Sequence, residues 1–283
     1  MAIVMKGIEV AKAMKEKLLE ETEKLKEKGI FPSLTIVRVG ARPDDLAYER
    51  GALKRMELTG IDCKVVELPE DISQEAFEEE FRKVNDDVNV HGILLFRPLP
   101  KHLDEEPVKK IINPLKDVDC MSDINIAKVF SGDKEGFAPC TAEAVVEMLK
   151  HFGVELTGKK VTIIGRSMVV GKPLSMLMLG ENATVKVCHT KTRNLAEECK
   201  EAEILVAAAG KASMITADMV SKMTVVADVG INVNENGQLC GDVDYEAVAG
   251  KAAMISPVPG GVGSITTSIL ARHVIRSAKY LNK

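Results

Sequence analysis

No apolar run in this 283-residue sequence approaches the roughly 18–20 residues that a membrane span needs. Internal repeats and low-complexity segments are also absent, and the N-terminal residues soon become a charged amphipathic pattern, so we expect no signal peptide. The formal net charge of −4 argues against binding to nucleic acid. What remains is a globular protein with 46% hydrophobic residues, long enough for one large domain or two ordinary ones.

Paired cysteines and clustered histidines are missing as well. The six cysteines are scattered without a C-x-x-C pair, and the five histidines show no H-x-x-x-H or similar spacing. We therefore expect free thiols, no disulfide and no metal site. Free thiols also favour a cytoplasmic location.

Short β-branched runs alternate with amphipathic helical patterns, which is typical of parallel α/β sheets. In the first half we expect strands at 34–39, 63–68 and 91–96 and helices at 8–28, 45–59, 73–85 and 104–112. In the second half we expect strands at 161–164, 184–188, 204–208 and 224–229 and helices at 141–152, from 172, near 194–201, near 216–221 and from 265. The boundary between the two halves is expected near residues 120–141.

The most informative stretch is VTIIGRSMVVGKP at residues 161–173. A buried strand that ends in Gly-Arg-Ser and continues into a helix leaves bare backbone N–H groups at the helix N-terminus, where phosphate groups bind. A glycine-rich turn also occurs in many α/β proteins for packing alone. The strand before it, the helix after it and a further strand about twenty residues on favour the nucleotide interpretation.

The end of that further strand indicates which nucleotide is bound. Proteins that prefer NAD usually place an acidic residue there for the ribose hydroxyl. This chain has His189-Thr190-Lys191-Thr192-Arg193 instead, with Arg166 nearby in sequence. Hydroxyl and basic groups suit a 2′-phosphate, so NADP is favoured over NAD. His189 could also be a strand-end histidine that only bonds backbone.

Several segments, in order along nearly the whole chain, resemble the bacterial methylenetetrahydrofolate dehydrogenase/methenyltetrahydrofolate cyclohydrolase family. They are 92–95 with 98–100, 116–119, 139–141, 165–173, 188–192, 228–232, 241–243 and 257–263. The resemblance implies an α/β fold of two domains with a cleft between them. A folate-binding domain would comprise residues 1–120 with the C-terminal helix 266–283, and a Rossmann NADP-binding domain would comprise 121–265.

The resemblance also implies roles for particular residues. Tyr48 would pack beside the pterin or aminobenzoate, and Asp119 would hold the polar edge of the pterin, as suits a flat ring rich in N–H donors. Without the family pattern, both would be read as structural residues. Further folate contacts would come from Leu95, Pro98, Leu99, Pro259, Gly260, Gly261 and Thr266. Contacts with the dinucleotide would come from Gly165, Arg166, Ser167, Gly171, His189, Thr190 and Ile231.

Three positions depart from the family pattern, of which one is Ser264, where proline is usual, and two concern the cyclohydrolase step. The family has a lysine four residues after the tyrosine, taken as the acid–base group of the cyclohydrolase step, and a glutamine that hydrogen-bonds it. Here these positions hold Ala52 and Phe96. Lys54 lies two residues further on, about 200° around the helix, and so points away from Tyr48.

Hydride transfer depends mainly on positioning, whereas hydrolysis of methenyl-folate needs proton movement. We therefore expect an NADP-dependent dehydrogenase acting on tetrahydrofolate derivatives, with weak or absent cyclohydrolase activity. One alternative is a bifunctional enzyme in which Arg97, Lys54 or a water moves the proton. Others are a non-catalytic folate- or NADP-binding subunit and a different two-domain dehydrogenase. The family is usually dimeric, which implies a homodimer.

Overall fold

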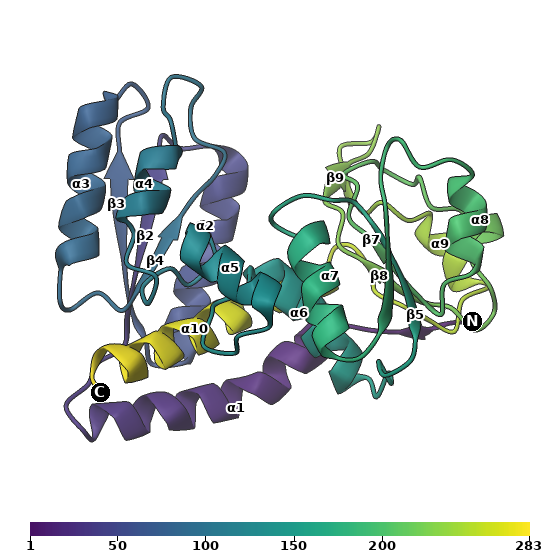
Figure 1. The fold of residues 1–283 in the computed structure, drawn as a ribbon, viewed down its shortest axis with the longest axis horizontal. Helices are drawn as coiled ribbons and strands as arrows, with labels where there is room; N and C mark the ends of the chain where they lie inside the picture. Colours follow the sequence, from purple (N-terminus) through teal and green to yellow (C-terminus); the bar gives the residue numbers. More distant parts are fainter. The chain divides into compact units, whose positions relative to one another are not determined.

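The computed structural model describes all 283 residues, which divide into two compact units (Figure 1). The large-sheet unit comprises Met1–Lys12 and Thr141–Thr266. The small-sheet unit comprises Ala13–Cys140 and Thr267–Lys283. Each unit has its own parallel sheet, so the predicted fold class is confirmed.

The small sheet has the strand order β3-β2-β4, with β2 (Ser33–Val39) between β3 (Asp62–Leu68) and β4 (Gly92–Leu95). Both pairings are parallel, as the alternation of strands and helices predicts. Every residue of β2 is buried, because a central parallel strand is covered on both faces.

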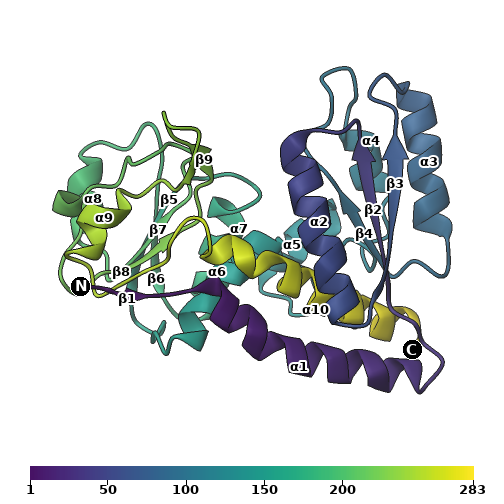
Figure 2. The same cartoon turned by 180° about the vertical axis from the view of Figure 1, so that it is seen from behind.

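Helices cover both faces of the small sheet. They are α2 (Pro43–Leu58), α3 (Gln74–Asp86) and α4 (Glu106–Ile111). Helix α2 lies on one face, while α3 and α4 lie on the other (Figures 1 and 2). Phe77 and Phe81 of α3 are fully buried in the core under that second face. The unit also contains α5 (Asp123–Ser131) and α10 (Thr266–Leu281), and α1 (Gly7–Lys26) begins in the large-sheet unit and continues here.

The large sheet has six strands in the order β1-β11-β8-β7-β5-β6. They are β1 (Ile3–Val4), β5 (Lys160–Ile164), β6 (Thr184–Cys188), β7 (Ile204–Ala207), β8 (Val225–Asp228) and β11 (Met254–Ile255). All neighbours are parallel. The carboxyl ends of these strands therefore share one edge, where ligands bind in open α/β sheets.

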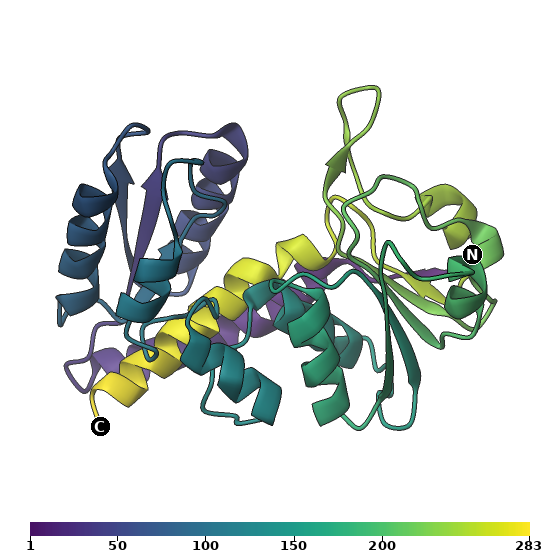
Figure 3. The same ribbon diagram turned by 45° about the horizontal axis from the view of Figure 1, so that its top comes forward.

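The helices of this unit are α6 (Cys140–His151), α7 (Gly171–Gly180), α8 (Leu195–Lys200) and α9 (Tyr245–Ala249). Helices α6 and α7 lie on one face of the sheet and α8 and α9 on the other (Figures 1 and 2). A separate antiparallel pair, β9 (Asn232–Val233) and β10 (Leu239–Cys240), forms a hairpin that projects from the unit (Figure 3).

The structure corrects some predicted elements. Residues 216–221 form only a 3-10 turn at Ala217–Met219, because Val220 is already extended. Helix α5 lies in a segment predicted only as a domain boundary; Ser122 caps it by accepting the Asn125 N–H at 3.2 Å. The two-residue strands β1, β9, β10 and β11 are not among the predicted elements, since they are too short to show a period of two.

The compact units differ from the predicted domains in two segments. Residues 1–12 join the large sheet because β1 pairs with β11, through Ile3 with Met254 and Val4 with Ile255. Residues 121–140 stay with the small-sheet unit, where Asn125 donates to Asp117 and the Cys140 N–H donates to Asp119.

Candidate active site

Among the segments predicted to bind the nucleotide, the turn from β5 into α7 has the closest approach of main-chain atoms. Gly165 has φ of 128°, and a Cβ added there would lie 2.1 Å from the Ala208 carbonyl oxygen. A Cβ on Gly171 would lie 2.1 Å from the Gly165 carbonyl oxygen. Only glycine fits at both positions, which brings the start of α7 directly against the end of β5.

The residues between these two glycines are largely exposed. The Ser167 hydroxyl accepts the Val170 N–H at 3.1 Å, and the Ser167 carbonyl accepts the Lys172 N–H at 3.1 Å. These bonds hold the turn without covering it, so Arg166 and Ser167 remain accessible at the N-terminus of a ten-residue helix. This arrangement fits the phosphates of a dinucleotide.

A second rigid turn follows β6. The His189 N–H donates to the Thr192 hydroxyl at 2.8 Å, and the Lys191 N–H donates to His189 Nδ1 at 3.1 Å. With Nδ1 acting as acceptor, the neutral ring carries its proton on Nε2. His189 thus has the backbone-bonding role considered as an alternative, while Thr190 stays exposed.

The cations around this edge lack acidic partners. Arg166, Lys191 and Arg193 form no ion pair, and Arg166 and Lys191 are exposed together with Thr190. In contrast, Lys186 on β6 is bound by Glu201 at 2.8 Å and by Glu198. Unpaired cations and hydroxyls with no carboxylate at the end of β6 suit a 2′-phosphate.

Two buried carboxylates, absent from the predicted site residues, anchor the loops at the same edge. Asp242 accepts the N–H groups of Ala209, Gly210 and Lys211 at 2.6, 3.0 and 2.8 Å. It also accepts the Asn232 amide at 2.9 Å. The loops after β7 and β8 are therefore held by one side chain. The sequence Gly241-Asp242-Val243 does not indicate this role, because the N–H groups that Asp242 binds belong to another loop.

The second carboxylate is Asp228, at the end of β8. It accepts the backbone N–H groups of Gly230, Asp242 and Val243 at 3.0–3.1 Å. Burial raises the pKa of Asp228 to about 6, against the lowering effect of these N–H donors. The loop carrying Ile231, which is 70% exposed, is thereby fixed beside the sheet edge.

The glycine loop before α10 is equally constrained. The Gly7 N–H donates to the Gly260 carbonyl at 2.9 Å, and a Cβ on Gly261 would lie 2.3 Å from the Pro257 carbonyl oxygen. The Val258–Pro259 peptide is cis, and the buried Thr266 hydroxyl donates to the Gly263 carbonyl at 3.1 Å. The predicted folate contacts of this loop are thus presented by a fixed backbone.

In the small-sheet unit, Asp119 lies in a loop pinned on both sides. Before it, Asp117 accepts the Met121 and Ser122 N–H groups at 2.8 and 2.9 Å. The Asp119 carboxylate itself accepts the Cys140 N–H at 2.8 Å. Asp119 is half-buried, so its carboxylate has a fixed position at the edge of the unit.

Opposing effects act on the Asp119 carboxylate. Burial raises its pKa, while the Cys140 N–H and the positive charge of Arg97 lower it. Arg97 follows β4 in a cis Arg97–Pro98 peptide, and its Nη1 lies 4.0 Å from Glu105. The predicted residues Asp119 and Arg97 are therefore electrostatically linked.

Of the two altered positions, Ala52 lies on helix α2 and Phe96 directly follows β4. Tyr48 is partly exposed, and its ring meets that of Phe96 edge to face with centroids 5.8 Å apart. Ala52 is completely buried and Phe96 nearly so. Lys54 is exposed on another side of the helix, as the 200° rotation predicts. No titratable side chain occupies either altered position.

A cavity of about 280 Å³ lies at the carboxyl ends of the small-sheet strands. Its lining comprises Val39, Gly40, Ala41, Arg42, Glu70, Pro98, Leu99 and Pro100. Arg42 Nη1 donates to the Pro98 carbonyl at 3.1 Å. Two predicted folate contacts, Pro98 and Leu99, thus line a concave surface, while Leu95 is buried in β4.

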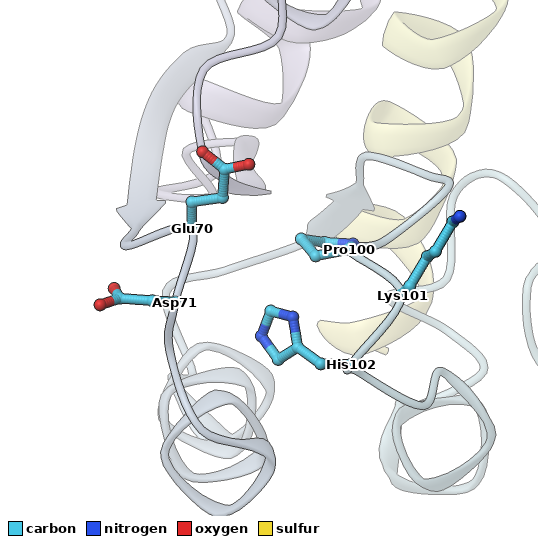
Figure 4. Close-up of a pocket in the computed structure, with 5 residues that line it drawn as sticks. All are labelled: Glu70, Asp71, Pro100, Lys101 and His102. Atoms are coloured by element: carbon cyan, nitrogen blue, oxygen red, sulfur yellow. The ribbon is translucent and has the colours of Figure 1, made fainter.

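A wider, shallower pocket adjoins it through Glu70 and Pro100 (Figure 4). His102 reaches into it, but its Nε2 is 3.1 Å from the Ile72 carbonyl and so already has a partner. Asp71 and Lys101 point away from it. None of the predicted catalytic residues lines this pocket.

Two further properties bear on the possible chemistry. No group of three or more His, Cys, Asp or Glu side chains is arranged to hold a metal ion, and all six cysteines are free. None of the helices combines the length and apolar character that a bilayer crossing requires.

Two family models match this chain, one over its N-terminal part and one over its C-terminal part. The family model described as tetrahydrofolate dehydrogenase/cyclohydrolase, catalytic domain, matches residues 5–119. The model for the NAD(P)-binding domain of the same family matches residues 139–282. The two matches together cover most of the chain.

Individual relatives agree. The bifunctional protein FolD of Clostridioides difficile (strain 630) is 59% identical over 279 residues, covering 99% of this chain and 97% of the relative. The crystal structure of the bifunctional enzyme FolD from Campylobacter jejuni has a TM-score of 0.96 at 38% identity, covering 99% of both chains. FolD of Trypanosoma brucei, solved with NADP cofactor and an inhibitor, has a TM-score of 0.93 at 35% identity, covering 99% and 98%.

Proposed function

The chain belongs to the tetrahydrofolate dehydrogenase/cyclohydrolase family, and from that membership we propose that the two reactions of the family are unequally served here. It is an NADP-dependent methylenetetrahydrofolate dehydrogenase of one-carbon metabolism, which oxidises 5,10-methylenetetrahydrofolate to 5,10-methenyltetrahydrofolate. The subsequent hydrolysis to 10-formyltetrahydrofolate is weak or absent.

The oxidation asks the protein mainly for positioning. Bound NADP⁺ supplies the hydride acceptor, and the lone pair of a folate nitrogen expels the hydride, so no protein base is obligatory. We assign dinucleotide binding to the tight turn at Gly165, Arg166, Ser167 and Gly171 and to His189, Thr190 and Ile231. The close glycine contacts and the unpaired cations of this edge support that assignment.

The hydrolysis asks for more. Water must add to the amidinium carbon, and a proton must then move so that a C–N bond can break. General acid–base catalysis of such a step is typically worth about 10²–10⁴-fold. The observation that carries the proposal is that Ala52, completely buried, and Phe96, packed on Tyr48, occupy the two family positions for this proton transfer.

The remaining folate contacts are proposals of the same kind. Tyr48 offers a ring face and Asp119 a fixed carboxylate acceptor for the N–H groups of the pterin. Further contacts are assigned to Leu95, Pro98, Leu99, Pro259, Gly260, Gly261 and Thr266. The cavity beside Pro98 and Leu99 supports their part in this set.

A bifunctional enzyme with a different proton carrier is the second candidate. Because a guanidinium keeps its proton at neutral pH, Arg97, whose charge acts on Asp119, would hold a water that carries the proton. Lys54 is less suited, because it is exposed on a different side of α2 from the buried Ala52.

We also infer a cytoplasmic homodimer. Six free cysteines are typical of a reducing compartment. The β9–β10 hairpin exposes Val233 and Leu239, at 65% and 53%, on a projecting arm of a kind that proteins commonly cover by association. Sedimentation of the wild type beside a Val233→Asp/Leu239→Asp variant tests the dimer, which the two charges should dissociate.

One reaction tests the division between the two activities. Methylenetetrahydrofolate and NADP⁺ are mixed with the protein, and NADPH and methenyltetrahydrofolate are followed together against a protein-free blank. If cyclohydrolase activity is absent, the two products accumulate one to one, and methenyltetrahydrofolate decays only at the rate measured without protein. Rapid loss of methenyltetrahydrofolate would establish the bifunctional candidate, and absence of NADPH would leave a binding subunit.

A further inference from the structure

One half-buried cation on α2 has no acidic partner. Arg55 lies three residues after Ala52 and seven after Tyr48, a spacing that places all three on one side of the helix. Side chains of a helix tilt toward its N-terminus, so the long side chain of Arg55 leans toward the turn that carries Ala52. Lys54 lies on a different side and is exposed.

The contacts of Arg55 leave most of its hydrogen-bonding capacity unused. A guanidinium carries five N–H donors. The side chain makes one long contact, from Nε to the Thr267 hydroxyl at 3.5 Å, and no carboxylate lies within ion-pair distance. Burial lowers the pKa of Arg55, and no acidic neighbour counteracts this.

The same unit shows how a buried arginine is ordinarily accommodated. Arg38 on β2 is bound by Glu49 at 2.7 Å and by Glu67 at 2.8 Å, so its charge is neutralised within the fold. Glu49 lies on α2 as well, one residue after Tyr48. Since buried charges are normally paired, an unpaired one beside a ligand site indicates that the ligand supplies the partner.

We propose that Arg55 is a folate-binding residue whose guanidinium donates to an oxygen of the substrate. This rests on the proposed function, and it deepens it: the folate site keeps a positive charge one helical turn beyond the family lysine position. Thr267, which Arg55 contacts, directly follows Thr266, one of the residues assigned to folate binding. A guanidinium does not release its proton at neutral pH. The charge of Arg55 therefore serves substrate binding, and Arg55 does not supply the proton transfer that the hydrolysis needs.

Two oxygens of the substrate have the required chemistry, the carbonyl of the pterin ring and the carboxylates of the glutamate tail. Both accept hydrogen bonds, and the carboxylate is the stronger partner of a guanidinium. A substrate that ends at the aminobenzoate carboxyl, without glutamate, distinguishes the two sources.

The test compares Arg55→Met with the wild type in the dehydrogenase reaction. We expect the KM for methylenetetrahydrofolate to rise about 10–100-fold, the value of one charge-assisted hydrogen bond, with kcat and the KM for NADP⁺ nearly unchanged. The thermal midpoint should stay the same or rise, because an unpaired half-buried charge is removed. Arg50→Met, at an exposed position of the same helix, is the matched control and should change neither.

The remaining arms separate the outcomes. Arg55→Lys should recover part of the affinity, and Arg55→Gln replaces Arg55→Met if that variant does not fold. With the glutamate-free substrate, a persisting effect assigns the pterin carbonyl and a lost effect assigns the tail. An unchanged KM for both substrates overturns the role of Arg55, whereas absence of NADPH formation by the wild type overturns the proposed function instead.

Discussion

The nucleotide edge, by which we mean the turns after the carboxyl ends of the large-sheet strands, is shaped by main-chain atoms. At the two altered positions of the small-sheet unit, the family's function depends on side chains. At Gly165 and Gly171, main-chain atoms approach so closely that a single Cβ would collide. At Ala52 and Phe96, different side chains occupy the family positions while α2 and β4 remain regular.

This difference teaches which part of an enzyme can change without loss of fold. A backbone site cannot be altered without moving strands and helices, so its function is retained together with the fold. A proton-transferring side chain can be replaced by an apolar one of suitable volume, because a packed interior tolerates such changes at small cost. Hydride transfer uses the first kind of site and hydrolysis the second.

The largest effect is expected at the backbone site. Gly165→Ala places a Cβ 2.1 Å from the Ala208 carbonyl oxygen at a φ of 128°. We expect NADP⁺ affinity and NADPH formation to fall by about 100-fold or more, since a displacement of about 1 Å can cost that much. Titration with NADP⁺ and initial rates measure this.

Gly180→Ala provides the control, because no heavy atom lies within 4 Å of the added Cβ at the end of the same α7. Wild-type NADP⁺ binding by Gly165→Ala would show that the tight turn does not hold the cofactor.

The next effect is a gain of function in the small-sheet unit. Ala52→Lys with Phe96→Gln restores both family side chains, and Arg55→Ala removes a like charge one turn away. At saturating methenyltetrahydrofolate, which offsets the weaker folate binding caused by Arg55→Ala, we expect the kcat of hydrolysis to increase by up to about 10²-fold in the triple variant, less in the double and least in Ala52→Lys alone. The single variant would bury an ammonium with no partner, since position 52 is completely covered.

Methenyltetrahydrofolate hydrolysis and NADPH formation are measured on the same samples. An equal gain in Ala52→Lys alone would show that position 96 and Arg55 have no part in the change, and a parallel gain in both activities would indicate a general effect on folate binding.

A smaller effect concerns the choice of dinucleotide. Arg166→Ala/Arg193→Ala removes two unpaired cations from the nucleotide edge, so the KM for NADP⁺ should rise about 10-fold while that for NAD⁺ changes little. Lys186→Ala on β6 is the control, because Glu198 and Glu201 already neutralise that cation. Equal changes for both dinucleotides would contradict a 2′-phosphate site.

The smallest expected effect is on the pH dependence of stability, which we attribute to a histidine of the small-sheet unit. Burial and the charge of Lys116 lower the pKa of His91, whose Nδ1 has no partner. The folded state then binds fewer protons than the unfolded state. The stability contributed by a neutral His91 is therefore complete above the unfolded-state pKa of about 6.5 and is lost as the pH falls from there through the lower folded-state pKa.

We expect His91→Leu to lose less stability than the wild type between neutral pH and about pH 5, in thermal unfolding followed by circular dichroism. His151→Leu changes an exposed histidine of the large-sheet unit and should keep the wild-type pH dependence. If the thermal midpoint falls equally with pH in all three proteins, His91 does not bind a proton on unfolding and the prediction is wrong.

Much of the fold could be predicted because its elements are long and periodic. The strands at 184–188 and 63–68 and the helix after Gly171 lie where their patterns indicate. The strands of two residues could not be predicted, because they are too short to show a period of two. For β1 the partner is also distant in sequence, since Ile3 pairs with Met254, 251 residues away.

The nucleotide edge was easier to predict than its supports. Gly165 and Gly171 follow a recognisable spacing, whereas Asp228 and Asp242 act through backbone N–H groups of distant loops. Arg55 is not among the residues predicted from the sequence, where its position seven residues after Tyr48 is the only indication of a shared helix side. Its lack of a partner depends on where the acidic side chains lie in three dimensions, which spacing does not reveal.

The pairing of β1 with β11 also has a consequence for biosynthesis. Val4 is synthesised 251 residues before its partner Ile255. At roughly 5–20 residues per second, the first strand waits about 12–50 s for its place in the sheet. Throughout that interval β1 lacks its only neighbour in the sheet, so the nucleotide-binding layer is completed only after Ile255 has been made.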